Sequence, residues 1–108
     1  MIKTIAEIGI NHHGEKDKAL RLIKYASESN CWAVKFQYRS DDFFAANDEM
    51  GSTLIREELQ NSNLQKSWIS DLIEYSKKLG LKVGFSFFRA KDIIDFFDTN
   101  GFHSDFIK

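Results

Sequence analysis

Two ionisable side chains lie inside short apolar runs of the sequence. Glu7 lies in the run 5–10, Ile-Ala-Glu-Ile-Gly-Ile, and Lys35 lies in the run 32–37, Trp-Ala-Val-Lys-Phe-Gln. Each run is typical of a buried strand, where a full charge is costly unless another group pairs with it. A carboxylate can take up a proton and an ammonium can bind an anion. We therefore expect the two charges to pair with each other and to serve a common site.

The sequence around these charges predicts alternating strands and helices. Apolar residues in the segment 16–29 recur at the helical spacing i, i+3, i+4, i+7, and a similar face runs through 65–79 before Gly80. We predict helices over 16–29, 65–79 and 91–99 and strands over 3–9, 32–37, 81–86 and 105–108. The segment 38–63 has no clean periodicity apart from a short helix over 53–59. A connection of this length is usually a functional or a mobile loop.

Alternation of strands and helices predicts a parallel sheet with right-handed crossovers. Two architectures fit this order: an open doubly wound sheet, and the first half of a (β/α)₈ barrel. An open nucleotide-binding sheet has a glycine-rich turn after its first strand. The spacing of Gly9 and Gly14 does not match that turn, which disfavours the open sheet.

Polar side chains near the C-terminal ends of the predicted strands favour the barrel. Lys35 and Gln37 share one face of their strand, and Ser86 and Lys108 occupy comparable positions at the ends of the next two. A whole barrel takes about 250 residues, so 108 residues hold less than half of one. We predict a single partial domain over 1–108, of class α/β, that forms the incomplete first half of a (β/α)₈ barrel.

The composition disfavours several classes of protein. The chain has 15 basic and 16 acidic residues, interspersed without a basic stripe, which argues against nucleic-acid binding. The apolar runs are far shorter than the roughly 20 residues that span a membrane, and the first residues lack the features of a signal peptide. A single cysteine, Cys31, leaves no internal disulfide and fits a reducing compartment. We therefore expect a cytoplasmic protein.

Two motifs in order carry a resemblance to a known family. Residues 5–14, Ile-Ala-Glu-Ile-Gly-Ile-Asn-His-His-Gly, and residues 33–37, Ala-Val-Lys-Phe-Gln, resemble the opening of the N-acetylneuraminate (sialic acid) synthase family. The resemblance implies a (β/α)₈ barrel that condenses phosphoenolpyruvate with the open-chain aldehyde of an N-acetylated hexose such as N-acetylmannosamine. It also implies a divalent metal, Mn²⁺ or Mg²⁺, whose histidine ligands come from later strands that this sequence does not contain.

The resemblance assigns roles to four of the residues above. Lys35 matches the lysine that binds the phosphoenolpyruvate anion, and Ser86 and Lys108 match groups that contact its phosphate. Glu7 matches the acid beside the carbon where water adds. Phosphoenolpyruvate carries close to three negative charges at neutral pH, so a site that removes it from water needs several cations and hydrogen-bond donors.

Three further residues are expected to contact the substrate. Gln37 shares the face of Lys35, and His12 matches the Asn-His pair that follows the first strand in the family, which predicts that His12 lines the pocket. Asn11 either caps the loop through an Asx turn or touches the substrate. His12 and His13 do not suggest a metal site, because adjacent histidines do not easily face one ion and no cysteine accompanies them at ligand spacing.

The chain also departs from the family pattern. The family follows the hydroxyl of the third strand with proline, whereas this chain has no proline and reads Ser86-Phe87-Phe88. Lys108 lies a few residues further from Ser86 than is usual in the family. The segment 39–63 shows no counterpart of the sugar-binding segment, so the sequence does not specify the sugar.

These observations support two functions of different classes. The first is a sialic-acid-type synthase, a carbon–carbon bond-forming transferase that is inactive as this fragment alone. The alternative is a non-catalytic half-barrel module whose unpaired outer strands assemble with another chain, as in a homodimer. A Schiff-base aldolase that uses Lys35 gains little support from the motif after the first strand.

Overall fold

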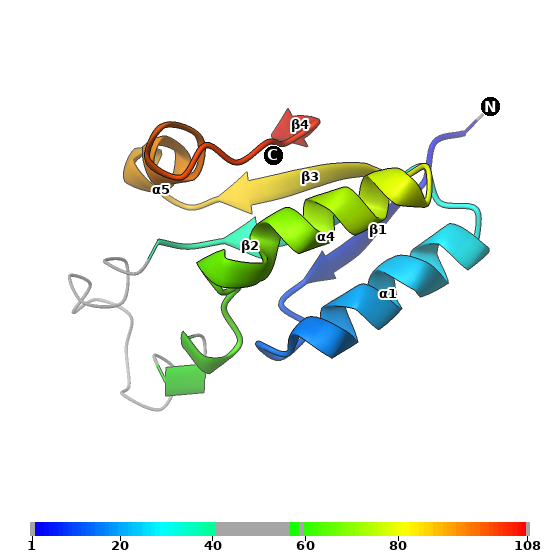
Figure 1. The fold of residues 1–108 in the computed structure, drawn as a ribbon, viewed down its shortest axis with the longest axis horizontal. Helices are drawn as coiled ribbons and strands as arrows, with labels where there is room; N and C mark the ends of the chain where they lie inside the picture. The colour runs from blue at the N-terminus through cyan, green and yellow to red at the C-terminus, as the bar shows by residue number, and fades with distance from the viewer. Residues whose placement is uncertain (1, 41–56, 59, 108) are drawn as a thin grey trace.

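The computed structural model describes residues 2–40, 57–58 and 60–107 (Figure 1). Its strands are β1 (Ile5–Gly9), β2 (Ala33–Tyr38), β3 (Lys82–Phe87) and β4 (Phe106–Ile107). Its helices are α1 (Lys16–Glu28), α4 (Lys66–Lys78) and α5 (Ala90–Ile94), which continues into the π-helical turn η1 (Asp95–Thr99). Most of the helix expected over 53–59, and Lys108 at the end of the last strand, lie outside the described residues.

The sheet is parallel throughout, and its strand order β1-β2-β3-β4 follows the order of the chain. Parallel neighbours need a crossover connection, and helical segments lie in each of the three crossovers. In Figure 1, α1 and α4 lie side by side in front of the sheet, and α5 lies beside β3. The predicted α/β class and the parallel alternation are therefore confirmed.

The hydrophobic core lies between the sheet and helices α1 and α4. Phe36 of β2 is fully buried there, in one cluster with Ile23 of α1 and Leu72 of α4. Burying a side chain of this size stabilises a fold by about 1.5–3 kcal/mol. Because side chains alternate along a strand, Lys35 and Gln37 lie on the opposite face, which these helices leave open.

The third helical segment is less regular than its sequence pattern predicts. Instead of one helix over 91–99, α5 ends at Ile94 and the chain continues as η1, where the Asn100 N–H bonds to the Asp95 carbonyl at 3.0 Å. A π turn holds one residue more than an α turn and changes which side chains face the sheet. Here it accompanies the complete burial of Phe96, whose ring centroid lies 4.6 Å from that of Phe85.

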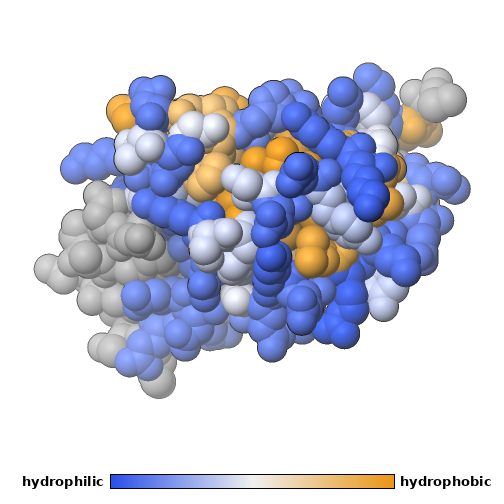
Figure 2. Space-filling model, viewed as in Figure 1, coloured by the Kyte–Doolittle hydropathy of each residue, from blue (hydrophilic) through white to orange (hydrophobic). Residues whose placement is uncertain are grey.

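Polar and charged side chains cover most of the helix-bearing side of the molecule, with apolar side chains in smaller patches (Figure 2). Such a surface is ordinary for a water-exposed helical layer. Among the described helices, none is both long and apolar enough to cross a membrane.

Candidate functional site

The sheet register brings polar residues of three strands together on the open face. Glu7 of β1 pairs with Lys35 of β2, and Gln37 of β2 pairs with Ser86 of β3. Lys35 and Gln37 are two residues apart and therefore share this face. The four residues form two successive rows across the sheet, near the C-terminal ends of the strands.

The Lys35 ammonium connects the two rows. Its Nζ forms an ion pair with Glu7 Oε2 at 2.8 Å and donates a hydrogen bond to Ser86 Oγ at 2.5 Å. Lys35 is only 7% exposed, so these oxygens replace the water that its charge has lost. An ammonium has three N–H donors, and within the described part of the chain these partners occupy two of them. The remaining donor can bind an anion.

Glu7 is not buried as the apolar run around it predicts. Its side chain is 52% exposed, because β1 is an outer strand of the described sheet. The cost of desolvation therefore falls on Lys35, while Glu7 pairs with it from a hydrated position. A carboxylate in contact with water beside a bound anion can orient that water or accept its proton.

Gly9 ends β1 in a backbone conformation that favours glycine, next to Gln37. Its φ of 54° lies in the left-handed region that favours glycine, and the β1–β2 register shifts between Glu7 and Gly9. A Cβ on Gly9 would lie 3.5 Å from Gln37 Nε2 and 3.6 Å from Glu7 Oε1. The Gln37 amide and the Glu7 carboxylate therefore both lie within 4 Å of one point at the end of β1.

The structure does not bring all the predicted site residues into this group. His12 is fully buried on the helix-covered side, where its ring packs edge-on against Trp68 at 5.6 Å and lies 6.2 Å from Phe36. Asn11 is exposed in the turn after β1. Lys108 lies outside the described residues, so its contact with phosphate stays a prediction.

Burial determines the charge of His12. The Gly14 N–H donates to His12 Nδ1 at 2.9 Å, so Nδ1 carries no proton in this turn. Burial, together with the nearby His13, lowers the pKa of His12 to about 4. His12 is therefore a neutral, aromatic part of the core that anchors the turn after β1.

A divalent metal is the cofactor that the sequence resemblance implies. Protein sites for such ions gather several side-chain ligands. Among residues 2–40, 57–58 and 60–107, no three His, Cys, Asp or Glu side chains lie close enough together to hold an ion. By themselves, the described residues do not form a metal site.

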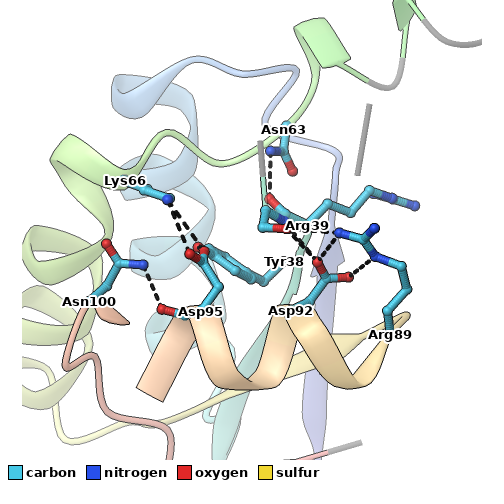
Figure 3. Close-up of polar contacts among 9 residues, drawn as sticks. Tyr38, Arg39, Asn63, Lys66, Arg89, Asp92, Asp95 and Asn100 are labelled. Atoms are coloured by element: carbon cyan, nitrogen blue, oxygen red, sulfur yellow. Dashed lines mark hydrogen bonds and ion pairs between the residues drawn. The ribbon is translucent and has the colours of Figure 1, made fainter. Parts of the chain in front are cut away.

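A second polar cluster, which the sequence reasoning missed, holds the end of β2 from the side of α5 (Figure 3). Asp92 is fully buried and accepts hydrogen bonds from the Ser40 N–H at 3.2 Å, Ser40 Oγ at 2.7 Å and Arg89 Nη2 at 2.8 Å. Burial raises the pKa of Asp92, but the bonds from Arg89 and Ser40 outweigh it and hold the pKa below its usual range. The buried charge of Asp92 therefore has hydrogen-bond partners, and it connects α5 to Ser40, two residues after the end of β2.

Asp95, one turn further along, binds the same end of β2 to α4. Its carboxylate accepts a hydrogen bond from the Tyr38 hydroxyl and pairs with Lys66 Nζ at 3.3 Å (Figure 3). The three-residue spacing of Asp92 and Asp95, which makes them neighbours on one side of a helix, was the available signal. These contacts fix the C-terminal end of the strand that carries Lys35.

Comparisons with known proteins identify relatives over most of this chain. It is 32% identical over 81 residues to the spore coat polysaccharide biosynthesis protein SpsE of Bacillus subtilis. It is 33% identical over 78 residues to the uncharacterized protein MJ1065 of Methanocaldococcus jannaschii. The matches cover 68% and 71% of this chain but 22% of each relative, so the chain spans about a fifth of the length of these curated relatives. No protein-family model matches the chain.

Solved structures share the fold. N-acetylneuraminic acid (sialic acid) synthetase from Leptospira borgpetersenii serovar Hardjo-bovis, solved in complex with citrate, matches with a TM-score of 0.69 and 29% identity over 85% of this chain and 31% of that chain. SpsE from Bacillus subtilis matches with a TM-score of 0.67 and 28% identity over 94% of this chain and 27% of that chain.

The chain thus has partial homology to the family of sialic acid synthases and SpsE proteins, over the N-terminal part of the barrel domain. Its four parallel strands and their helices match part of a TIM barrel of these structures. The resemblance drawn from residues 5–14 and 33–37 is confirmed at this level, and so is the prediction of a partial barrel.

The buried, neutral His12 makes the stability of the fold depend on pH. Because burial lowers its pKa from 6.5 to about 4, the unfolded chain binds the proton first as the pH falls. The contribution of His12 to the free energy of unfolding is therefore constant above pH 6.5 and falls by about 3 kcal/mol between pH 6.5 and 4.

His12→Asn keeps an acceptor near the position of Nδ1 and cannot titrate. We expect the difference in unfolding free energy between wild type and this variant, measured with urea, to shrink as the pH falls from 6.5 to 4. His103→Asn is the control, because the His103 side chain is 55% exposed. An equal pH dependence of both differences contradicts this account of His12.

Proposed function

We propose that this chain, homologous to the sialic acid synthase family over the N-terminal part of the barrel, is the phosphoenolpyruvate-binding part of a sialic-acid-type synthase. The complete enzyme condenses phosphoenolpyruvate with an N-acetylated hexose such as N-acetylmannosamine. The observation that carries the proposal is the contact of Lys35 Nζ with both Ser86 Oγ and Glu7 Oε2 on the open face of the sheet. These are the types of group that binding and hydration of an enol phosphate require.

Each residue of this group has a chemical task in the proposed reaction. Lys35 gives a charge-assisted hydrogen bond to the phosphoenolpyruvate anion, and Ser86 adds a neutral donor when its hydroxyl turns to the ligand. Lys108, at the predicted end of the fourth strand, adds a second cation. The C3 carbon of phosphoenolpyruvate bonds to the sugar aldehyde, whose oxygen takes up a proton, and water then adds to the electron-poor C2 carbon. Glu7 orients that water or takes its proton, and the C–O bond to phosphate breaks as the ketone of the product forms.

The group of residues on the open face is a part of such a site, not the whole. The chain covers 22% of its curated relatives, and no three His, Cys, Asp or Glu side chains of the described residues lie together to hold a metal ion. We therefore expect the 108-residue chain to bind phosphoenolpyruvate without catalysing the condensation. Condensation by the pure chain contradicts this expectation.

Binding of phosphoenolpyruvate by the chain tests the proposal. Hydrogen bonds to charged groups contribute about 1.5–3 kcal/mol, so Lys35→Met is expected to weaken binding about tenfold or more. Isothermal titration calorimetry measures the Kd of wild type and variant. Lys24→Met is the matched control, because Lys24 is exposed on α1. Equal affinity of the two variants, or no binding by the wild type, contradicts the proposal.

The two open edges of the sheet favour a second candidate function. Within the described residues, β1 and β4 each have one side without a neighbouring strand. Apolar side chains are exposed near both edges: Ile5 (44%) and Tyr25 (58%) beside β1, and Ile107 (55%) on β4. Unpaired edges with apolar side chains pair readily with another chain. The alternative proposal is a non-catalytic half-barrel module whose two copies join β1 to β4 around a two-fold axis.

The oligomeric state decides this alternative. We expect light scattering after size exclusion to give the mass of a dimer or larger assembly for the wild type. Ile107→Lys is expected to shift the population towards monomer, because a charge on an edge strand opposes pairing. Ile2→Lys, at a residue that is 92% exposed before β1, is the control. A monomeric wild type at high concentration rules the alternative out.

A further inference from the structure

The position next to Lys35 on β3 is a glycine, Gly84, and the aromatic ring of Phe106 fills the space that a side chain there would occupy. Gly84 of β3 is the register partner of Lys35 on one side and of Phe106 of β4 on the other. A Cβ on Gly84 would lie 2.3 Å from Phe106 Cε2 and 2.4 Å from its Cζ. The Phe106 ring therefore lies over the Gly84 backbone, in the same row of the open face as Lys35.

The Phe106 ring also contacts an aromatic residue next to β2. It stacks on Trp32, with ring centroids 5.8 Å apart and planes at 20°, and Lys3 Nζ lies 4.7 Å from the centre of the Trp32 ring. Trp32 directly precedes β2, and its N–H bonds to the Thr4 carbonyl at 2.8 Å. The ring of Phe106 thus extends from β4 over Gly84 of β3 and stacks on the residue that precedes β2.

We infer that Phe106 is a positioning residue for Lys35: its ring fills the space over Gly84 and directs the Lys35 ammonium to Ser86 and Glu7. The inference rests on the proposed function, since the ammonium is the group proposed to bind the anion. A lysine stem has four rotatable bonds and much conformational entropy. With the space over Gly84 closed, fewer of its conformations remain, and they include the one with both oxygen contacts.

Loss of the ring is expected to weaken anion binding through Lys35. With a smaller side chain at position 106, the lysine stem can lie across Gly84 and the ammonium leaves Ser86. Binding of the anion must then fix the conformation of the Lys35 side chain, and the entropy lost in doing so weakens the affinity. We expect the Kd for phosphoenolpyruvate to rise about three- to tenfold in Phe106→Leu and Phe106→Ala.

The matched control is the same substitution, phenylalanine to leucine, at Phe97. Phe97 of η1 is a partly buried ring that packs against Phe96 and Phe87, within the cluster of rings around Phe96. Phe97→Leu is therefore expected to lower the thermal midpoint of unfolding without changing the Kd. Equal losses of affinity in Phe97→Leu and Phe106→Leu contradict a positioning role.

A rescue separates positioning from general packing. Gly84→Ala in the wild-type chain collides with the Phe106 ring and is expected to weaken binding. In the Phe106→Ala background the added methyl group occupies part of the vacated space and is expected to restore affinity. Gly84→Ala is thus expected to lower the affinity in the wild type and to raise it in Phe106→Ala. Two substitutions that act independently through stability do not show such a change of sign.

Two measurements complete the test: a calorimetric titration with phosphoenolpyruvate, which gives the Kd, and a nuclear Overhauser spectrum of the protein without ligand. A wild type that does not bind overturns the proposed function and this inference with it. A wild type that binds while folded Phe106 variants bind equally well overturns the inference alone. Nuclear Overhauser contacts between the Phe106 ring protons and the Lys35 methylene protons are expected in the wild type. Their absence overturns the inference whether or not the variants fold.

Discussion

A buried ammonium is the constraint on which the rest of this structure depends. Lys35 lies inside a four-stranded sheet and is almost fully shielded from water. A charge in that position needs oxygen atoms at close range. Glu7 supplies one from β1 and Ser86 supplies the other from β3. The charge is therefore satisfied only when the three strands keep their parallel register, so register and site depend on each other.

The division of the sheet into two faces makes such a site possible. One face is covered by α1 and α4 and carries the hydrophobic core, so the stabilisation from apolar burial comes mainly from that side. The other face can then carry polar residues without weakening the core. Asp92 and Asp95 fix the end of β2 from α5 and η1 (Figure 3), which holds Lys35 and Gln37 in place through contacts outside the site.

Much of this arrangement could be predicted from the sequence, and the exceptions have physical reasons. The placement of Lys35 and Ser86 on one face of the sheet could be predicted, because side chains alternate along a strand and the C-terminal ends of parallel strands lie at the same edge. The exposure of Glu7 could not be predicted, because a local sequence pattern does not reveal which strand is outermost. The motif around His12 marks a turn but not the direction of the ring, which packs on a residue far along the chain. Asp92 is tolerated in the interior because Ser40 joins Arg89 there in the folded chain.

The dependence of the buried ammonium on its carboxylate partner is measured by the coupling between Glu7 and Lys35. A double-mutant cycle of Glu7→Gln and Lys35→Met, followed by urea unfolding, measures it without any ligand. Because Glu7 is half exposed, we expect a favourable coupling of about 0.5–1 kcal/mol at low ionic strength. This coupling should decrease as salt is added. Additive effects of the two substitutions at low ionic strength would contradict the account.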